Sequence, residues 1–415
     1  MAGALSPHGS DGPSFAATIA ALAIGQLLCW AALYYGFSSF VLPMMRELDW
    51  SKPLVMGAFT VGLAAWGLAT YAAGAAVDHG HGRAVMTLGT VLGAAACALW
   101  SQAQAPWVLY ASCLLLGVAM AMTLYEPAFN IVTHRYPARY REAITALTLV
   151  GGFASTLSFP ACVWLIGAIG WRSALLALAA CLLFVVAPLH AWALRGTALA
   201  PAPARPLDTA ADATLHEALR HPTFWLLTAS FTLHAFVIAA LWAHVMPAFA
   251  ARDVDEAATL AVLVWIGPAQ VAGRFAFAWL GRSLSLRRVG LLSLLAIALS
   301  FGLFAWSAHP AVLLVFALLF GAGNGLVTIV RGGMVPEYFG RSHVGRIGGA
   351  MSAVSLLSRA AAPLAAAWVL LVLPGYRELM LVLAAVSAGA WVAFALARPP
   401  RGSSLRQACR DGRRR

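Results

Sequence analysis

Four charged residues lie deep inside apolar stretches of this sequence: three arginines, Arg274, Arg331 and Arg359, and one acid, Glu126. An unpaired charge in such surroundings costs about 3 kcal/mol or more, so each is expected to find a partner. A guanidinium matches a carboxylate in a bidentate fork, and three positive charges against one negative charge favour an anion site. The structural alternative is that the arginines snorkel or bind backbone carbonyls and only hold helices together.

The stretches that carry these residues are long enough to cross a bilayer, since a spanning helix needs about 20 apolar residues. Of the 415 residues, 61% are hydrophobic and 10% are charged, and the alternation typical of barrel strands is missing. The sequence predicts an all-α membrane protein with twelve transmembrane helices. The predicted spans are residues 15–43, 53–77, 84–103, 107–134, 142–168, 172–194, 222–249, 257–281, 287–307, 311–337, 345–373 and 376–397.

Basic residues fall mainly in alternate connections between the spans. One set of connections and the tail contain Arg83, Arg135, Arg139, Arg141, Arg195, Arg205, Arg220, Arg282, Arg287, Arg288, Arg341, Arg346 and the arginines from Arg398 to Arg415. The other set contains only Arg46, Lys52, Arg172, Arg252 and Arg377, together with six acids. Because basic loops stay in the cytoplasm, both termini are predicted to be cytoplasmic, in the inner membrane of a bacterium.

A Pro/Ala-rich connection divides the chain into halves that echo each other. IGWRSALLALAA follows the fifth span, and PGYRELMLVLAA follows the eleventh. The predicted organisation is an N-terminal six-helix bundle at 1–194, a cytoplasmic linker at 195–221, a C-terminal six-helix bundle at 222–397 and a basic tail at 398–415. Duplicated halves around a central site are typical of secondary transporters. The net charge of +12 lies largely in the tail, which favours contact with the lipid bilayer over nucleic acid.

The loop after the second span, GAAVDHGHGRAV, resembles a motif of the major facilitator superfamily. Gly74, Asp78, Gly82 and Arg83 match the motif, and His79 stands where Arg is usual. The resemblance extends over about residues 15–397. It implies two pseudo-symmetric six-helix bundles that alternate access to a central site. It also implies that Asp78, with Gly74 and Arg83, forms a cytoplasmic latch between conformations.

Within the superfamily, the chain resembles the monocarboxylate and oxalate carriers. Span one ends YYGFSSFVLPMMRELDWS, and span eight contains GPAQVAGR, which places Gly267, Gln270 and Arg274 on that branch's Gly-x-x-Asp-x-x-x-Arg pattern. The chain departs from the pattern because Gln270 replaces the acid and span one has no Lys. The resemblance implies that Arg274 binds the substrate carboxylate and that Arg359 supplies a second cation.

Glu126 and Arg331 occupy nearly equivalent positions in the two halves. Aligning GVAMAMTLYEPAF with GAGNGLVTIVRGG places Arg331 one residue past the equivalent of Glu126. Spans four and ten face each other in this fold, so an ion pair is predicted. The pair could close the cytoplasmic side, or it could release a proton when it separates. His234, in span seven, is a second candidate for proton coupling, although a lone histidine on an apolar helix is more often a structural residue.

Other polar and aromatic side chains are expected near the same pocket: Trp30, Tyr34, Tyr35, Tyr125, Gln270 and Asn324. No P-loop, HExxH or GxSxG motif occurs, so an enzyme is not indicated. We interpret the chain as a secondary transporter for a small organic anion, a monocarboxylate first, coupled to protons. An efflux carrier for drugs or amphipathic metabolites is the alternative. The protein is expected to act as a monomer, without a metal or other cofactor.

Overall fold

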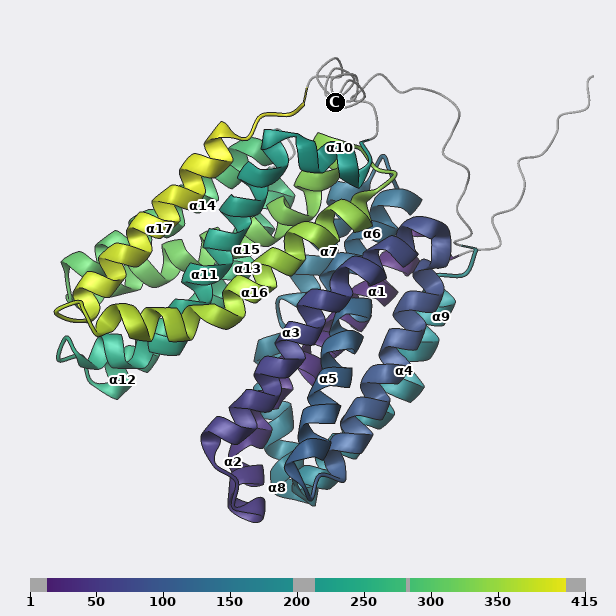
Figure 1. Cartoon of the computed structure of the whole chain (residues 1–415), viewed down its shortest axis with the longest axis horizontal. Helices are drawn as coiled ribbons and strands as arrows, with labels where there is room; N and C mark the ends of the chain where they lie inside the picture. Colours follow the sequence, from purple (N-terminus) through teal and green to yellow (C-terminus); the bar gives the residue numbers. More distant parts are fainter. Residues whose placement is uncertain (1–12, 197–212, 281–283, 401–415) are drawn as a thin grey trace, which may run out of the picture.

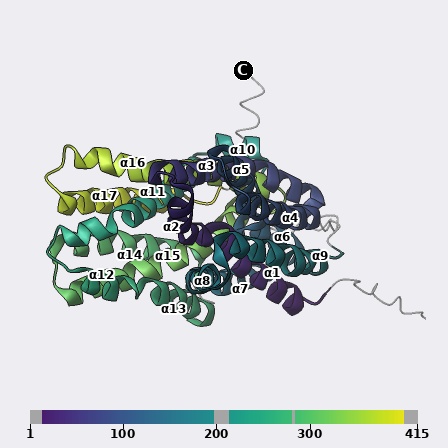
Figure 2. The same cartoon turned by 90° about the horizontal axis from the view of Figure 1, so that it is seen from below.

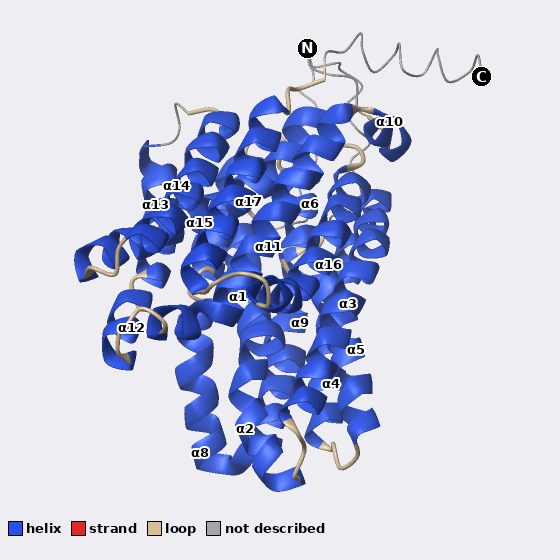
Figure 3. Cartoon of the chain, turned by 60° about the vertical axis from the view of Figure 1, so that its left-hand side comes forward, coloured by secondary structure: helices blue, strands red, loops and turns tan. Residues whose placement is uncertain are grey.

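The computed structural model describes residues 13–196, 213–280 and 284–400, and every regular element in these ranges is a helix (Figure 3). The N-terminal elements are α1 (Phe15–Cys29), η1 (Trp30–Tyr35), α2 (Gly36–Leu48), α3 (Lys52–Ala76), η2 (Val77–His81), α4 (Gly82–Ser101), α5 (Pro106–Thr123), α6 (Tyr125–Arg135), α7 (Tyr140–Gly151), α8 (Ala154–Cys181), η3 (Leu182–Val186) and α9 (Ala187–Ala193). The remaining elements are α10 (Leu215–Arg220), α11 (Pro222–Ala250), α12 (Glu256–Leu263), α13 (Ile266–Leu280), α14 (Leu286–Trp306), α15 (Pro310–Phe339), α16 (Val344–Leu370) and α17 (Tyr376–Leu396).

Two helical segments are too long to cross a membrane only once. Ten segments of the described chain are long and apolar enough to span, and two of them, Leu54–Ser101 and Tyr140–Ala193, contain 48 and 54 residues. At 1.5 Å per residue these would extend roughly 70 and 80 Å, more than twice the hydrocarbon core. Each is broken by a glycine with a positive φ, Gly80 at 89° and Gly170 at 78°. Dividing the two segments at these glycines gives the twelve predicted spans.

The helices form two bundles, one of α1–α9 and one of α11–α17 (Figure 1). The bundles meet at the end that carries α10 and diverge toward the end that carries α2, α8 and α12 (Figure 1). Seen from below, α16 and α17 lie on one side and α4 and α9 on the other (Figure 2). We call the end with the connections 77–83, 136–141 and 340–346 the basic end. The end with the connections 49–51 and 251–255 is the acidic end.

Glycines let equivalent helices approach closely in both bundles. In the N-terminal bundle, a Cβ on Gly117 of α5 would lie 2.0 Å from the carbonyl oxygen of Gly62 on α3. In the C-terminal bundle, a Cβ on Gly321 of α15 would lie 2.5 Å from the carbonyl oxygen of Ile266 on α13. Small residues at such crossings allow backbones to pack directly in a membrane. The sequence alignment of Gly117 with Gly321 therefore corresponds to matching helix contacts.

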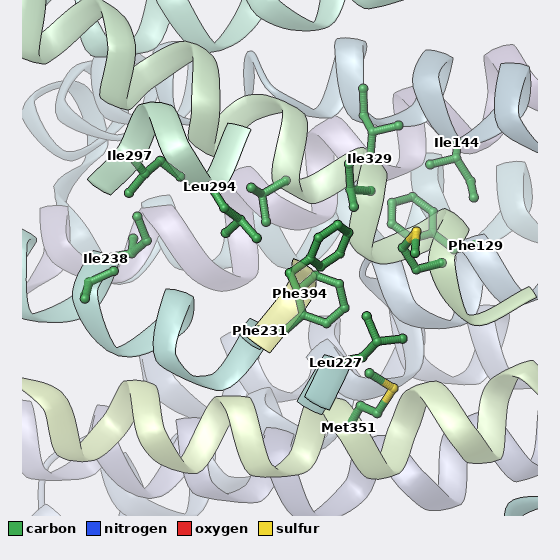
Figure 4. Close-up of a cluster of buried hydrophobic side chains, with 14 of the residues drawn as sticks. Phe129, Ile144, Leu227, Phe231, Ile238, Leu294, Ile297, Ile329, Met351 and Phe394 are labelled. Atoms are coloured by element: carbon green, nitrogen blue, oxygen red, sulfur yellow. The ribbon is translucent and has the colours of Figure 1, made fainter. Parts of the chain in front are cut away.

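Within the described residues, the apolar core that joins the bundles lies mainly toward the basic end. One buried cluster joins α11, α14, α15 and α17 to Phe129 and Ile144 of the N-terminal bundle (Figure 4). The contact is made at Gly332 of α15, where a Cβ would lie 2.6 Å from Phe129 and 3.3 Å from Ile144. A second cluster lies mainly within the N-terminal bundle and continues to its acidic end.

Several predicted segments differ in detail from the structure. Span four is divided at Leu124 into α5 and α6, and span five is divided at residues 152–153 into α7 and α8. Span eight is not one helix, because a turn at residues 264–265 separates α12 from α13. Part of the predicted linker is helical, since Thr214 and Glu217 form a capping box that starts α10. Residues 197–212 of the linker and 401–415 of the tail, with Arg205 and Arg282, lie outside the described residues.

Candidate functional site

Asp78 joins the two bundles at the basic end by capping a helix of the other half. Its Oδ1 accepts a hydrogen bond from the backbone N–H of Gly345, and its Oδ2 accepts one from that of Arg346, both at 2.9 Å. These two residues are in the first turn of α16, where backbone N–H groups lack helical partners. A carboxylate there also interacts favourably with the helix dipole. Asn130 of α6 donates to Oδ1 at 2.9 Å and holds the carboxylate in position.

A seam of glycines allows α3 and α16 to pack directly beside Asp78. A Cβ on Gly74 would lie 2.2 Å from the carbonyl oxygen of Gly345, and a Cβ on Gly349 would lie 2.9 Å from the Cα of Tyr71. Further from the basic end, a Cβ on Gly67 would still lie 3.3 Å from Leu356. We call Asp78 and this glycine seam the latch.

Arg83 does not take part in the latch, which corrects the prediction from the motif. It is exposed and has no hydrogen bond or ion pair within the described chain, because Gly82 and Val85 face inward and turn Arg83 outward. Arg346 contributes instead, and its Nη2 donates to His79 Nε2 at 2.8 Å. Since His79 Nδ1 lies 2.7 Å from the carbonyl oxygen of Ala75, this nitrogen carries the hydrogen and Nε2 accepts.

Two ion pairs also connect the bundles. Arg141 of α7 and Glu337 of α15 lie 2.6 Å apart near the surface. Deeper in the molecule, Arg331 Nη2 lies 3.8 Å from Glu126 Oε1 and donates to the Ser352 hydroxyl at 2.8 Å. The other carboxylate oxygen of Glu126 is buried and has no partner in the described part of the chain. Glu126 is therefore only loosely held by Arg331.

Arg274 is the most buried of the three arginines, with 4% of its surface exposed. Its Nε donates to the carbonyl oxygen of Gly325 at 3.1 Å, and its Nη1 donates to that of Thr148 at 2.9 Å. The guanidinium thus links α13 to α15 and to α7 of the other half. Gly152 makes room for it, because a Cβ there would lie 2.0 Å from Nη1. Of the two readings of Arg274, these contacts directly support the structural one.

Arg359 differs from Arg274 and Arg331 because no described residue hydrogen-bonds or pairs with its half-buried guanidinium. It lies two helical turns beyond Ser352 on α16, past the last close contact of the latch. Its neighbours on α16 contact both halves, since Leu356 packs against Gly67 of α3 and the Ser358 hydroxyl donates to the carbonyl oxygen of Thr232 on α11 at 3.3 Å. It is thus a charged donor that faces both halves.

Aromatic rings of the N-terminal half gather near these arginines. We call Trp30, Tyr34, Tyr35, Trp66 and Tyr125 the aromatic cluster. Trp30 is its centre, with ring centroids 5.4 Å from Tyr34, 6.0 Å from Tyr35, 5.8 Å from Trp66 and 5.0 Å from Tyr125. The hydroxyls of its three tyrosines have no hydrogen-bond partner among the residues described.

A local distortion of the first span creates this cluster. Residues Trp30–Tyr35 form a π-helix, in which the hydrogen bond runs from residue i to i+5. Residues i+4 and i+5 then both return to the face of residue i, so Tyr34 and Tyr35 lie beside Trp30. Tyr125 reaches the cluster across Gly151, where a Cβ would lie 2.5 Å from its hydroxyl.

The other predicted residues lie on the C-terminal side. Asn324 is half-buried on α15, and the buried Nδ1 of His234 on α11 has no partner among the described residues. Gln270 is half-buried on α13, with its backbone packed on Gly325. Sequence reasoning missed Trp66, Ser352 and Asn130, which look like ordinary helix residues until their neighbours are known.

A cavity of about 370 Å³ is found elsewhere, at the acidic end of the C-terminal half. It is lined by Arg252, Asp253 and Asp255 beside α12 and α15. Two carboxylates against one guanidinium make it unsuitable for an anion. The described residues hold no group of three side chains suited to a metal ion.

Comparison with known proteins agrees with this architecture. The sequence profile of the Major Facilitator Superfamily matches residues 22–284 and 236–410. The human organic anion transporter MFSD10 (TETRAN) is similar in structure, with a TM-score of 0.75, 16% identity and coverage of 92% of this chain and 100% of that one. The fucose:proton symporter FucP of E. coli is similar as well. Its structure in the outward conformation gives a TM-score of 0.69 and 13% identity over 92% of this chain and 99% of FucP.

No curated protein sequence matches the chain. The structural similarities, at such low identities, show the fold alone. The profile match covers most of the chain, in agreement with the paired bundles. The protein therefore belongs to the major facilitator superfamily and is a multi-pass membrane transporter rather than an enzyme.

Proposed function

We propose that the protein is a secondary active transporter that binds the carboxylate of a small organic anion at Arg359. The observation that carries this proposal is the unpartnered guanidinium of Arg359, on the part of α16 that packs against α3 near Trp66 and against α11 near Thr232. A charge inside a membrane protein without a protein partner is costly, so a ligand carboxylate is its natural counter-ion. Arg274, already bonded to two carbonyl groups, adds positive potential and fixes the neighbouring helices.

The contacts between the two halves also support an assignment of the side of the membrane to which the described conformation is open. Basic connections are retained in the cytoplasm, which makes the basic end cytoplasmic and the acidic end external. The latch and both ion pairs close the basic end, whereas no hydrogen bond or ion pair joins the described parts of the two halves near the acidic end. The described state is then outward-facing, the state named for FucP.

Glu126 is the proposed coupling residue. Its 3.8 Å contact with Arg331 is the only described interaction between a carboxylate and a guanidinium in the middle of the bundles. Because its second oxygen lacks a partner, separating α6 from α15 would leave an uncompensated carboxylate that favours taking up a proton. A proton bound in one conformation and released in the other would couple transport to the proton gradient.

Binding and transport should be measured on the same preparations. Purified protein is titrated with benzoate and acetate while its thermal unfolding is followed, since a ligand that binds the folded state raises the unfolding temperature. Proteoliposomes with a pH gradient of either direction then test accumulation and export. Arg359→Gln should abolish the shift, and Arg359→Lys should restore it only in part because the planar fork is lost.

The matched control is Arg288→Gln, which removes an exposed arginine of the same half. It should bind and transport like the wild type. Unchanged anion binding in a folded Arg359→Gln variant would refute the proposed role of Arg359. If the substrate accumulates only on the side that protons leave, it moves in exchange for protons. This result would instead favour an efflux carrier for amphipathic metabolites, the second candidate that the aromatic cluster supports.

A further inference from the structure

The two halves contribute different chemistry to the central region. The N-terminal half supplies rings, with Trp30 in contact with four of them. The C-terminal half supplies Arg274, Arg331 and Arg359. The two groups are close. Gly67, next to Trp66, packs against Leu356, which lies one turn before Arg359 on α16. Tyr125 packs on Gly151, next to the Gly152 that makes room for Arg274. A ligand held between the halves therefore contacts cations on one side and aromatic rings on the other.

Only one of the three guanidiniums is free to bind a carboxylate. Arg274 donates to the carbonyl oxygens of Gly325 and Thr148, and Arg331 is shared by Ser352 and Glu126. Arg359 has none of these engagements in the described chain. A second carboxylate on the same ligand would have no free cation and would face the rings. The charge arrangement thus favours a monoanion over a dianion such as oxalate.

The aromatic cluster is built to present ring surface. Trp66 is 2% exposed and forms its buried base, while Trp30, Tyr34 and Tyr35 are only half-buried. The pairs Trp30–Tyr34 and Tyr34–Tyr35 are edge-to-face, with interplanar angles of 76° and 87°. Rings set at such angles offer both faces and edges, which a further planar ring can use in stacked or edge-on contact.

We propose that the substrate is an aromatic monocarboxylate, whose carboxylate binds Arg359 and whose ring packs against the aromatic cluster. The Tyr35 hydroxyl, which has no partner among the described residues, donates a second hydrogen bond to the carboxylate. This proposal rests on the proposed function and adds the identity of the apolar part of the substrate. The π-helix at Trp30–Tyr35 then has a specificity role, because it places three rings on one face of span one.

The test compares ligands that differ in one property. Benzoate and cyclohexanecarboxylate have the same carbon skeleton size and charge but only benzoate is aromatic. Benzamide keeps the ring without the charge, and oxalate is a dianion without a ring. Dissociation constants are measured by calorimetry on the full chain in detergent. Benzoate should bind about 3- to 10-fold more tightly than cyclohexanecarboxylate, and both should bind more tightly than benzamide and oxalate.

Trp30→Leu should remove the preference for benzoate while retaining the weaker binding of cyclohexanecarboxylate. Trp30→Phe keeps a ring, should retain most of the preference and serves where the leucine variant fails to fold. The matched control is Trp279→Leu, which removes an indole that is 83% exposed on α13. It should leave the preference unchanged.

The outcomes separate the two proposals. Equal affinity for benzoate and cyclohexanecarboxylate, or a preference that persists in folded Trp30→Leu, overturns the aromatic substrate while anion binding stands. Tighter binding of oxalate than of benzoate also overturns it. If no carboxylate binds and Arg359→Gln changes nothing, the proposed function itself fails.

Discussion

Asp78→Asn should open the basic end of the protein without unfolding it. The carboxylate makes two hydrogen bonds to the first turn of α16 and accepts a third from Asn130. Asparagine has the same shape but only one acceptor oxygen. Its amide nitrogen must therefore face either Gly345 or Arg346, whose N–H groups cannot accept a hydrogen bond. At least one bond between the two halves is lost.

The size of the effect follows from these contacts. A hydrogen bond to a charged group contributes about 1.5–3 kcal/mol. The interaction of a carboxylate with a helix N-terminus adds about 0.3–1 kcal/mol. Asp78→Asn should thus destabilise the described state by about 3 kcal/mol relative to a state that is open at the basic end, which is roughly 100-fold in the ratio of the two states.

The ratio can be followed with two spin labels at the acidic end, at Ser51 and Ala251, both exposed and in different halves. Pulsed electron paramagnetic resonance should give a long distance between the two labels in the wild type and a shorter one in Asp78→Asn. Glu337→Gln is the control, since it breaks a surface ion pair between the same halves that contributes no more than about 1 kcal/mol. Equal distance distributions for wild type and Asp78→Asn, or a larger change for Glu337→Gln, would refute the latch argument.

Three further predictions follow from single contacts. Glu126→Gln should abolish proton-driven accumulation of substrate but retain substrate exchange, and normal accumulation by this variant would exclude Glu126 as the coupling residue. Combining it with Arg331→Gln should raise the yield of folded protein above that of either single variant, because no unpaired charge remains. Gly152→Ala should displace Arg274 and lower stability by about 1–3 kcal/mol in denaturant titrations, and an unchanged midpoint would contradict this. Burial lowers the pKa of His221, whose neutral ring accepts a hydrogen bond from the first turn of α11. Because the unfolded chain then binds a proton more readily than the folded protein, stability should fall as the pH drops below 6.5. The unfolding temperature of His221→Asn should depend less on pH over this range.

Much of the fold could be predicted from hydropathy and charge. The apolar stretches set the number of spans, and the repeated segments after spans five and eleven correspond to similar bundles. Sequence periodicity could not locate the π-helix at Trp30–Tyr35. Span one is apolar around the whole helix, so one extra residue in a turn leaves no visible break in the hydrophobic pattern. The break at residues 264–265 has a weak signal in the sequence, since Gly267 and Pro268 directly after it are typical of turns and helix starts.

The motif at Gly74 and Asp78 indicated a latch, but its partners could not be derived from one loop. Asp78 binds backbone N–H groups of Gly345 and Arg346, and such donors are present in every residue except proline. Which N–H groups are available depends on where α16 begins and how closely α3 approaches it. The glycine pair Gly74 and Gly345 decides that approach.

The three buried arginines show why residue type alone could not assign their roles. In the sequence each is a guanidinium within an apolar span, and the structure separates them by the acceptors nearby. Arg274 finds backbone oxygens because Gly152 and Gly325 leave space for its side chain to reach them. Arg359 has no hydrogen bond to a carbonyl group in the described chain, although Leu356 and Ser358 beside it contact α3 and α11. The arginine that the family pattern marks for the substrate is thus engaged by the protein itself, and Arg359, just beyond the latch, is available to a ligand. A substrate carboxylate at Arg359 would bridge both halves near the point where they diverge, so its binding and the closing of the acidic end would favour each other.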